Sequence, residues 1–530
     1  MPAPALNRAT LLGALMFLAA TTTAQKPTPT RPIQIENGKL LGVLTPDQKV
    51  IAYKGIPYAQ PPTEDLRWQP PQPIGKWKKV LLAADFGPHC LQSGGYPDMV
   101  FHDPGASEDC LTLNVWAPAD AAPSKKSPGL PVMVWIYGGG YYTGGTSESR
   151  QDGQFLARRG VIVVSMNYRL GIFGFFAHPE LTAESPSHAS GNYGLMDQAA
   201  AIAWVRRNIS AFGGDPANIT IFGQSAGAES VSALMASPVA KDLFNKAIGQ
   251  SGSEFPRYDR GSLTLQQAEQ ANTAWATRTF GTSKLFALRL LPAKEILGAA
   301  MSSSAPDFRP IIDGYFLPEP IEQTFAAGKQ AHVPLLGGWV ANEDRPNTPT
   351  TADSFTVQAH IEFGPNALKF LALYPATTDA EAIRSAADSA TDHSMAFPTW
   401  AWLEAQTKTG NTPVYRYFFD LPSPGDRNHP ASEGAFHSDD IEYVFGALDS
   451  RPEMQIRPED RALSELMQQY WTNFARTGDP NGPNLPKWPT YNAADNFQVM
   501  HLDARPTAAP DAHRPRYLFL NSIWSVPAVR

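Results

Sequence analysis

Cysteine is scarce in this sequence, since only two occur among 530 residues, and nothing around either one supports a catalytic thiol. Sustained basic runs are absent, and the formal net charge is −7, which argues against nucleic acid as the main partner. No repeat of fixed period is visible, which excludes a solenoid or a propeller. The sequence also lacks the His-Glu-x-x-His zinc motif, the Gly-x-x-x-x-Gly-Lys phosphate loop and a dinucleotide fingerprint, so it implies no metal and no cofactor.

Beyond the N-terminus, no stretch is long and apolar enough to span a membrane, so we expect no stable membrane anchor. The N-terminus itself carries Arg8, an apolar run from Leu11 to Ala20, and small residues up to Ala24, followed by a Pro/Thr-rich spacer. This order is typical of a secretory signal peptide. We therefore expect residues 1–24 to be removed near Ala24 and the mature chain to be secreted or periplasmic.

The two cysteines, Cys90 and Cys110, both lie in the expected mature chain. In the oxidising compartment that export implies, such a pair favours one disulfide over two free thiols. Closing a loop of this length stabilises the fold by about 3 kcal/mol in the chain-entropy model.

Almost wholly apolar runs alternate with helical patterns along the chain. Such runs are typical of strands buried on both faces of a parallel sheet, and their alternation with helices predicts βαβ units. The expected strands cover residues 132–137, 161–165, 219–222, 246–250, 333–340 and 414–420, with helices at 195–209 and 462–476. The sequence therefore predicts an α/β fold with a mostly parallel central sheet and helices on both faces. We expect residues 25–530 to form one domain, with large helical insertions around residues 254–330 and 353–408.

The pentapeptide Gly223-Gln224-Ser225-Ala226-Gly227 joins a β-branched run to a helix-compatible stretch. Strand, tight turn and helix form the context that the G-x-S-x-G motif of α/β-hydrolases requires. The two glycines permit the strained turn that presents the nucleophile, since side chains there would collide with the strand or the helix. Ser225 is therefore the candidate nucleophile.

A serine hydroxyl is a weak nucleophile at neutral pH, so it needs a base and an acid that orients the base. In the α/β-hydrolase plan these follow later strands, in the chain order Ser, then Asp or Glu, then His. The acid should follow the strand that ends at residue 340, which leaves Glu343 or Asp344. The base should follow the strand that ends at residue 420, which leaves His429 or His437. Periodicity alone does not choose within either pair.

Three glycines, Gly138 to Gly140, directly follow the buried strand 132–137. In such a loop, backbone N–H groups can approach a carbonyl oxygen that gains negative charge, which lowers the barrier of ester hydrolysis. The N–H of Ala226, at a helix N-terminus, adds a donor with a favourable dipole. The sequence thus predicts an oxyanion hole, with a merely flexible loop as the alternative.

At these residues the chain strongly resembles the type-B carboxylesterase family, the cholinesterase-like branch of the α/β-hydrolases. The resemblance runs nearly end to end after the signal peptide. It rests on ordered blocks at residues 53–59 (Tyr-Lys-Gly-Ile-Pro-Tyr-Ala), 107–111 (Ser-Glu-Asp-Cys-Leu), 212–216 (Phe-Gly-Gly-Asp-Pro), 222–227 and 435–446. So many blocks in order make the resemblance highly specific.

The resemblance implies a role for each candidate residue. It assigns the acid to Glu343, the base to His437, the oxyanion donors to Gly139, Gly140 and Ala226, and a disulfide to Cys90 and Cys110. The implied reaction is two-step acyl transfer from a small-molecule ester, in which His437 deprotonates Ser225 and water later hydrolyses the acyl-enzyme.

Other positions bear on the substrate. Tyr141 and Tyr142 are expected at the pocket entrance, with packing of the loop as the alternative, and Gln224 replaces the glutamate that is common in this family before the nucleophile. Asp344 stands where a glycine often follows the acid. Choline-binding relatives hold a quaternary ammonium group with a tryptophan between the cysteines, and none occurs here.

The remaining departures concern pocket size. Pro346 and Asn347 replace aromatic residues of the choline-binding members, so a choline ester is not the expected substrate. Residues 304–307 lack the bulky aromatics that constrict the acyl pocket in some relatives. This difference indicates room for a larger or more branched acyl group.

Two other functions are compatible with the sequence. Some family members have lost catalysis and act in adhesion, but these typically lack the nucleophile, whereas Ser225, Glu343 and His437 are all present here. The same triad also permits a narrow-specificity hydrolase of amides, thioesters or lactones, because the motif does not encode the leaving group.

Overall fold

The computed structural model describes residues 29–121, 128–256, 261–344, 346, 350–425 and 434–524. The expected signal peptide, His429 and Asn347 lie outside these residues. Within the described part of the chain, none of the helices combines the length and the apolar character that crossing a membrane would need.

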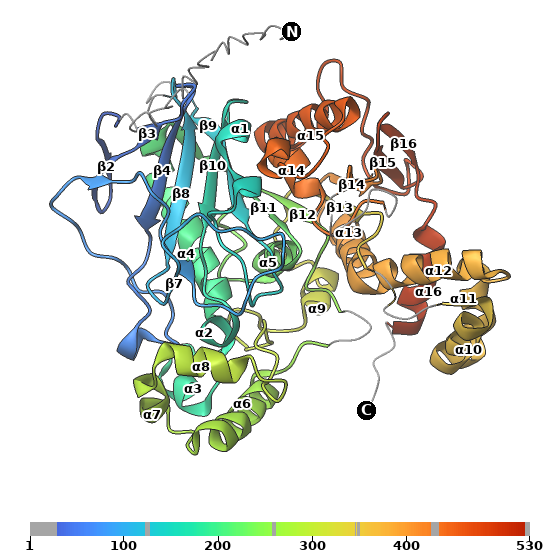
Figure 1. Cartoon of the computed structure of the whole chain (residues 1–530), viewed down its shortest axis with the longest axis horizontal. Helices are drawn as coiled ribbons and strands as arrows, with labels where there is room; N and C mark the ends of the chain where they lie inside the picture. Colours follow the sequence, from blue (N-terminus) through green and yellow to red (C-terminus); the bar gives the residue numbers. More distant parts are fainter. Residues whose placement is uncertain are drawn as a thin grey trace, which may run out of the picture.

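A large sheet forms the centre of the fold (Figure 1). Its strands are β3 (Val43–Leu44), β4 (Val50–Pro57), β8 (Thr112–Pro118), β9 (Leu130–Ile136), β10 (Ile162–Met166), β11 (Gly214–Gln224), β12 (Lys246–Gln250), β13 (Leu335–Val340), β14 (Val414–Phe419), β15 (Gln498–Leu502) and β16 (Thr507–Pro510). Their order across the sheet is β16-β15-β14-β13-β12-β11-β9-β10-β8-β4-β3. Neighbours from β15 to β10 pair in parallel, and the outer strands pair antiparallel. The expected mostly parallel sheet is confirmed.

Helices cover both faces of this sheet (Figure 1). They are α1 (Gln154–Ala157), α2 (Gly171–Phe175), α3 (Pro179–Glu184), α4 (Tyr193–Asn208), α5 (Ala226–Ala236), α6 (Leu265–Phe280), α7 (Leu285–Leu290), α8 (Ala293–Ala300), α9 (Ile321–Ala326), α10 (Ala352–Phe363), α11 (Ala367–Leu373), α12 (Asp379–Thr391), α13 (Phe397–Thr409), α14 (Asp440–Phe445), α15 (Pro458–Thr477) and α16 (Arg514–Trp524). A short 3₁₀ turn, η2 (Ser149–Gln151), precedes α1 and lies beside α14. Because β9, β10, β12 and β13 are buried almost throughout, their apolar side chains pack against helices on both sides.

Helices occupy the two segments where the sequence predicts insertions. Helices α6 to α9 lie between β12 and β13, and α10 to α13 lie between β13 and β14. Figure 1 shows α6 to α8 at one end of the molecule and α10 to α12 projecting at another. Local chemistry sets the bounds of α6, because Thr264 and Gln267 form a capping box and Gly281 ends the helix with a φ of 70°.

The N-terminal segment forms three short strands before β4. The chain forms β1 (Ile33–Ile35) and β2 (Gly38–Leu41) in a small antiparallel hairpin, and only β3 pairs with β4 in the main sheet. Strand β2 also pairs with β5 (Leu81–Leu82), and β6 (His89–Cys90) pairs with β7 (Ala106–Ser107). Cys90 and Cys110 form a disulfide, as expected.

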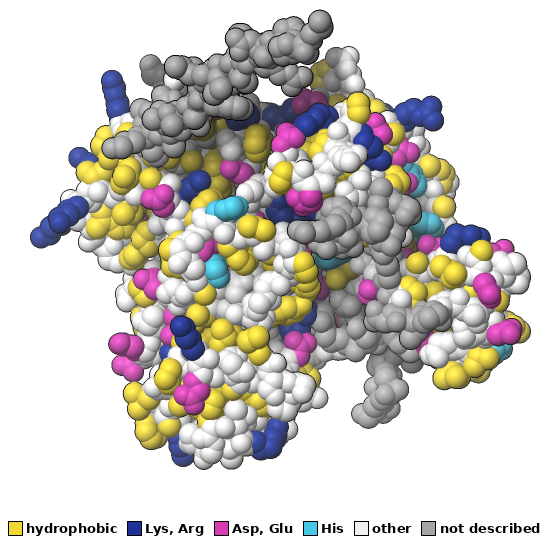
Figure 2. Space-filling model, viewed as in Figure 1, with side chains coloured by type: hydrophobic (Ala, Val, Ile, Leu, Met, Phe, Trp, Pro, Cys, Tyr) yellow, Lys and Arg dark blue, Asp and Glu magenta, His cyan; other side chains and the backbone are white. Residues whose placement is uncertain are grey.

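The surface carries charges of both signs. Figure 2 shows acidic and basic side chains interspersed over one face, without a large patch of one sign. Exposed apolar side chains gather on the projecting helices α10 and α11, among them Val357, Ile361 and Leu368.

Candidate active site

Ser225 lies at the sharp turn between β11 and α5. Its backbone has φ 57° and ψ −128°, a conformation that non-glycine residues rarely adopt. A hydrogen bond to the neighbouring strand β12 fixes the turn, because the Ser225 N–H donates to the Gln250 carbonyl oxygen at 2.9 Å. A Cβ atom at Gly227 would lie 2.0 Å from the carbonyl oxygen of Ile136, so only glycine fits there. This is the strained nucleophile turn that the motif predicts.

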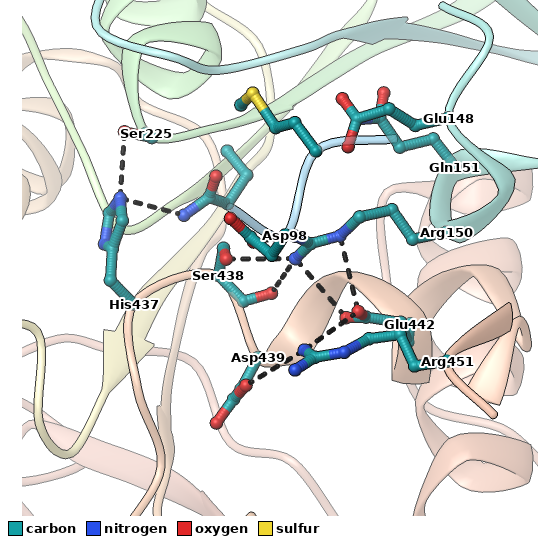
Figure 3. A network of polar contacts seen from close by, with 12 residues as sticks. Asp98, Glu148, Arg150, Gln151, Ser225, His437, Ser438, Asp439, Glu442 and Arg451 are labelled. Carbon is teal, nitrogen blue, oxygen red and sulfur yellow. Dashed lines mark hydrogen bonds and ion pairs between the residues drawn. The ribbon is translucent and has the colours of Figure 1, made fainter. Parts of the chain in front are cut away.

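Ser225, His437 and Glu343 form a continuous hydrogen-bonded chain. The Ser225 hydroxyl lies 2.9 Å from Nε2 of His437, and Nδ1 of His437 lies 2.5 Å from Oε2 of Glu343. Figure 3 draws the contact between Ser225 and His437 as a dashed line. With a proton on Nδ1, the ring donates to the carboxylate and its Nε2 lone pair accepts from the serine. In this arrangement the imidazole can take the hydroxyl proton.

Neighbouring strands bring the acid loop and the base loop together. Strands β13 and β14 pair in parallel, so the loops that follow them leave the same edge of the sheet. The N–H of Asn342 donates to the Ala435 carbonyl oxygen at 2.9 Å, which joins the two loops directly. Glu343 is then oriented by a hydrogen bond from the Val340 N–H to its Oε1 atom and by one from its own N–H to Thr391 Oγ1.

The structure distinguishes the acid candidates. Glu343, 8% exposed, contacts His437, whereas Asp344 is exposed. His437 meets the serine, and the alternative His429 lies outside the described residues.

The electrostatic environment of His437 favours its protonated form. Burial lowers the pKa of the imidazole, but the Glu343 carboxylate raises it, and the net direction is upward from 6.5. A second carboxyl, Asp440, adds to this upward effect. Burial raises the pKa of Asp440 to about 6, although Tyr417 and Gln250 both donate hydrogen bonds to it.

The glycine loop packs against the nucleophile turn. A Cβ atom at Gly138 would lie 2.9 Å from the Cβ of Ser225, and Gly139 and Gly140 have φ values of 107° and 65°. Among the described residues, none accepts a hydrogen bond from the N–H groups of Gly139, Gly140 or Ala226. Those donors are therefore available close to Ser225.

Comparisons with known proteins agree with this geometry. Residues 29–519 match the Carboxylesterase family. The chain belongs to this family. The type-B carboxylesterase resemblance is thereby confirmed, and this carboxylesterase is a carboxylic ester hydrolase.

Similar proteins cover nearly the whole chain. It is 36% identical over 510 residues to the para-nitrobenzyl esterase of Bacillus subtilis (strain 168), which covers 92% of this chain and 98% of that protein. It is 35% identical to the fumonisin B1 esterase of Sphingopyxis macrogoltabida (89% and 87% covered) and 34% identical to human carboxylesterase 5A (97% and 92% covered). Two structures of PNB esterase, at 35% and 36% identity, superpose with TM-scores of 0.77 and 0.76, each covering 92% of this chain and 99% of that chain. The α/β-hydrolase fold is confirmed.

The three expected pocket residues of this carboxylesterase differ in exposure. Tyr141 is fully buried, with its ring edge-on against Phe175, so it packs the loop rather than lining an entrance. Tyr142 is 41% exposed, and its hydroxyl contacts that of Tyr96. The amide nitrogen of Gln224 lies 3.3 Å from Nε2 of His437, beside the proposed reaction centre.

A cavity of about 220 Å³ lies next to the segment that lacks bulky aromatics. Asp307, at the end of that segment, and Arg309, two residues further on, line it on one side, and Ser253 and Glu254 line it from the loop after β12. Arg309 is anchored by an ion pair to Glu229 on α5 at 2.7 Å.

Sequence reasoning missed the residues that support the triad. Asp440 lies in the block 435–446, but no pattern indicates that its carboxyl faces the base. Thr391 ends α12, far from the other site residues in sequence, so only the fold reveals its hydrogen bond to Glu343.

Proposed function

We propose that this carboxylesterase hydrolyses small-molecule esters through an acyl-enzyme on Ser225. His437 acts as general base and then as general acid, and Glu343 orients and stabilises it. The observation that carries this proposal is the hydrogen-bonded chain from the Ser225 hydroxyl through both ring nitrogens of His437 to the Glu343 carboxylate.

The reaction proceeds in two steps. In the first, Ser225 Oγ bonds to the ester carbonyl carbon while its proton passes to Nε2 of His437, which then protonates the departing alcohol oxygen. In the second, His437 takes a proton from water, the water oxygen attacks the acyl carbon, and the returned proton frees Ser225. Atoms balance, because ester and water become acid and alcohol.

The N–H groups of Gly139, Gly140 and Ala226 form the proposed oxyanion hole. Gly138, which precedes two of these residues, lies against Ser225, and Ala226 directly follows Ser225, which supports this role. Preorganised N–H donors stabilise the negative charge that develops in each tetrahedral intermediate.

The acyl pocket of the proposed enzyme accepts larger or branched acyl groups, and a choline ester is not its substrate. The cavity beside Asp307 and Arg309 supports the first statement. The composition of the loop between Cys90 and Cys110, which holds no tryptophan, supports the second.

We also propose that residues 1–24 are a signal peptide and that residues 25–530 form the secreted or periplasmic domain. The Cys90–Cys110 disulfide supports this proposal, because such bonds persist in oxidising compartments. N-terminal sequencing of the exported protein tests it, with a start near Gln25 expected and an intact Met1 contradicting it.

A chain-length series of p-nitrophenyl esters tests the catalytic proposal. The parent should hydrolyse the series, and Ser225→Ala should lose roughly 10³-fold or more in kcat. Ser464→Ala, at a buried serine on α15, is the control and should retain activity. An active Ser225→Ala variant, or a well-folded parent that hydrolyses no ester in the series, would sink the proposal.

A further inference from the structure

The residue directly after the proposed base has a strained backbone. Ser438 has a φ of 75°, in the left-handed region that favours glycine. A serine that relaxed to negative φ would redirect the peptide it shares with His437. The imidazole would then move relative to Ser225 and Glu343, so something must hold Ser438 in place.

Arg150 makes the contacts that can do this. Its Nη2 atom donates to the carbonyl oxygen of Ser438 at 2.8 Å and lies 2.9 Å from the Ser438 hydroxyl (Figure 3). The Arg150 side chain is only 6% exposed, so these bonds are shielded from water. One guanidinium nitrogen therefore binds both the backbone and the side chain of the strained residue.

The other edges of the guanidinium are fixed by carboxylates from two separate segments. Nη1 contacts Asp98 at 2.5 Å, and Nε lies 3.3 Å from Glu442 on α14. Burial lowers the pKa of Arg150, but Glu442 and Asp98 raise it further, so the group stays charged. A planar, forked cation held on three sides has little freedom to move.

Asp98 lies in the loop that the Cys90–Cys110 disulfide closes. The contacts of Arg150 thus join this loop, η2 and the start of α14, three parts of the chain that are far apart in sequence (Figure 3).

We infer that Arg150 is a positioning residue, which holds Ser438 in its left-handed conformation and so keeps the imidazole of His437 aligned with Ser225. This inference rests on the proposed roles of Ser225 and His437. Arg150 acts through Ser438 and does not touch the triad. Since a displacement of about 1 Å can cost on the order of 10²-fold in rate, a small shift of the base suffices to slow acylation.

Arg451 offers a matched control. Its Nη1 atom lies 3.4 Å from the same Glu442 carboxylate, and it is buried to a similar degree, but its contacts run to Asp439 and Glu453 rather than to Ser438. Arg451→Gln therefore removes an equal charge from the same cluster without releasing the strained residue.

The test compares Arg150→Gln with Arg451→Gln under steady-state ester hydrolysis. We expect kcat of Arg150→Gln to fall about 10-fold or more with KM changed by less than about 2-fold, because no substrate contact is lost. The rate at which a phosphonate ester labels Ser225 should fall in parallel. Arg451→Gln should change kcat by less than about 3-fold.

Ser438→Gly provides the rescue arm, since glycine adopts positive φ without strain. The double variant Arg150→Gln/Ser438→Gly should be several-fold faster than Arg150→Gln alone. Equal losses of kcat in the two arginine variants, a loss carried by KM, or no rescue would each overturn the inference.

Two further variants separate the possible failures. If Arg150→Gln does not fold, Arg150→Lys replaces it. The compact ammonium group of lysine cannot reproduce the planar fork of arginine, so this variant should still lower kcat without changing KM. Ser225→Ala is measured in the same assay as every other variant. If it stays active, the proposed function itself fails. If it is inactive while Arg150 variants match Arg451→Gln, only the positioning inference fails.

Discussion

The Glu343 carboxylate sets the pH dependence that we expect of His437 as the proposed base. It holds the charged imidazole in place and, against the effect of burial, moves the pKa of His437 above 6.5. A base must be neutral to accept the serine proton. Because a higher pKa keeps the imidazole charged up to a higher pH, the enzyme should lose activity sooner as the pH falls.

The first prediction is therefore a pH profile. For the parent, kcat/KM should rise with pH along a limb whose apparent pKa lies above 6.5. Glu343→Gln removes the charge that favours the imidazolium, so its limb should move to lower pH. Its plateau should fall on the order of 10²- to 10⁴-fold, because the ring loses its orienting acid. A limb that stays in place or moves to higher pH would contradict the assignment of Glu343.

At the residue scale, the local sequence predicts Ser225 as the candidate nucleophile, whereas it leaves two candidates for the acid and two for the base. Ser225 could be predicted because Gly223 and Gly227, two residues away on either side, permit its tight turn. Glu343 and Asp344 are neighbours on one loop, so which of them faces His437 depends on the contact between two loops that are far apart in sequence. Burial of Tyr141 likewise depends on Phe175, which no periodicity links to the glycine loop.

At the scale of elements, the fit between β9, the nucleophile turn and α5 determines the shape of the site. Gly227→Ala should lower the free energy of unfolding by about 2–3 kcal/mol, because the new Cβ would meet the Ile136 carbonyl oxygen at 2.0 Å. Gly298→Ala is the matched control. Position 298 is in α8 with no atom within 4 Å of the added Cβ, so the change should stabilise by about 0.5–1 kcal/mol.

Urea unfolding of the two variants beside the parent measures both effects. Equal stabilities for the two alanine variants would contradict the close contact between β9 and α5.

Elements with a strong pattern were predicted closely from the sequence. Strand β12 covers the expected residues 246–250, and β14 ends one residue before the expected 420. The segment 33–44 is divided among β1, β2 and β3, and its local pattern does not show this division. Its turn at Glu36-Asn37 creates a separate hairpin, and the pairing of β2 with β5 is not visible in the local pattern.

At the scale of the whole molecule, burial makes several carboxyl groups harder to ionise in the folded state. Burial raises the pKa of Glu148 to about 8, and those of Asp392 and Asp439 to about 7. In the unfolded chain these groups ionise near their ordinary values. The stability that each contributes is therefore fully present below its unfolded pKa and is lost as pH rises through its folded pKa.

We therefore expect the free energy of unfolding to fall as pH rises from about 5 to about 8. Glu148→Gln cannot ionise, so it should lose less stability than the parent over that range. Glu295→Gln, at an exposed position on α8, is the control and should follow the parent. Urea unfolding at several pH values measures the slope, and an unchanged slope in Glu148→Gln would show that Glu148 ionises similarly in both states.

Contacts between segments that are far apart in sequence were the hardest features to predict. The sequence indicated helices in the segment that holds α10 to α13, yet nothing in it indicated that Thr391 would support the acid loop. Such contacts arise only when the sheet order places β13 and β14 side by side beneath that segment.

Trapping of the acyl-enzyme is the decisive test of covalent catalysis by Ser225. The protein is mixed with a p-nitrophenyl ester, quenched in acid at early times, digested and analysed by mass spectrometry. We expect one acyl group on the peptide that contains Ser225, appearing with the burst of p-nitrophenol and absent in Ser225→Ala. Steady hydrolysis with the acyl group on another residue, or with none on Ser225 in the burst phase, would contradict it.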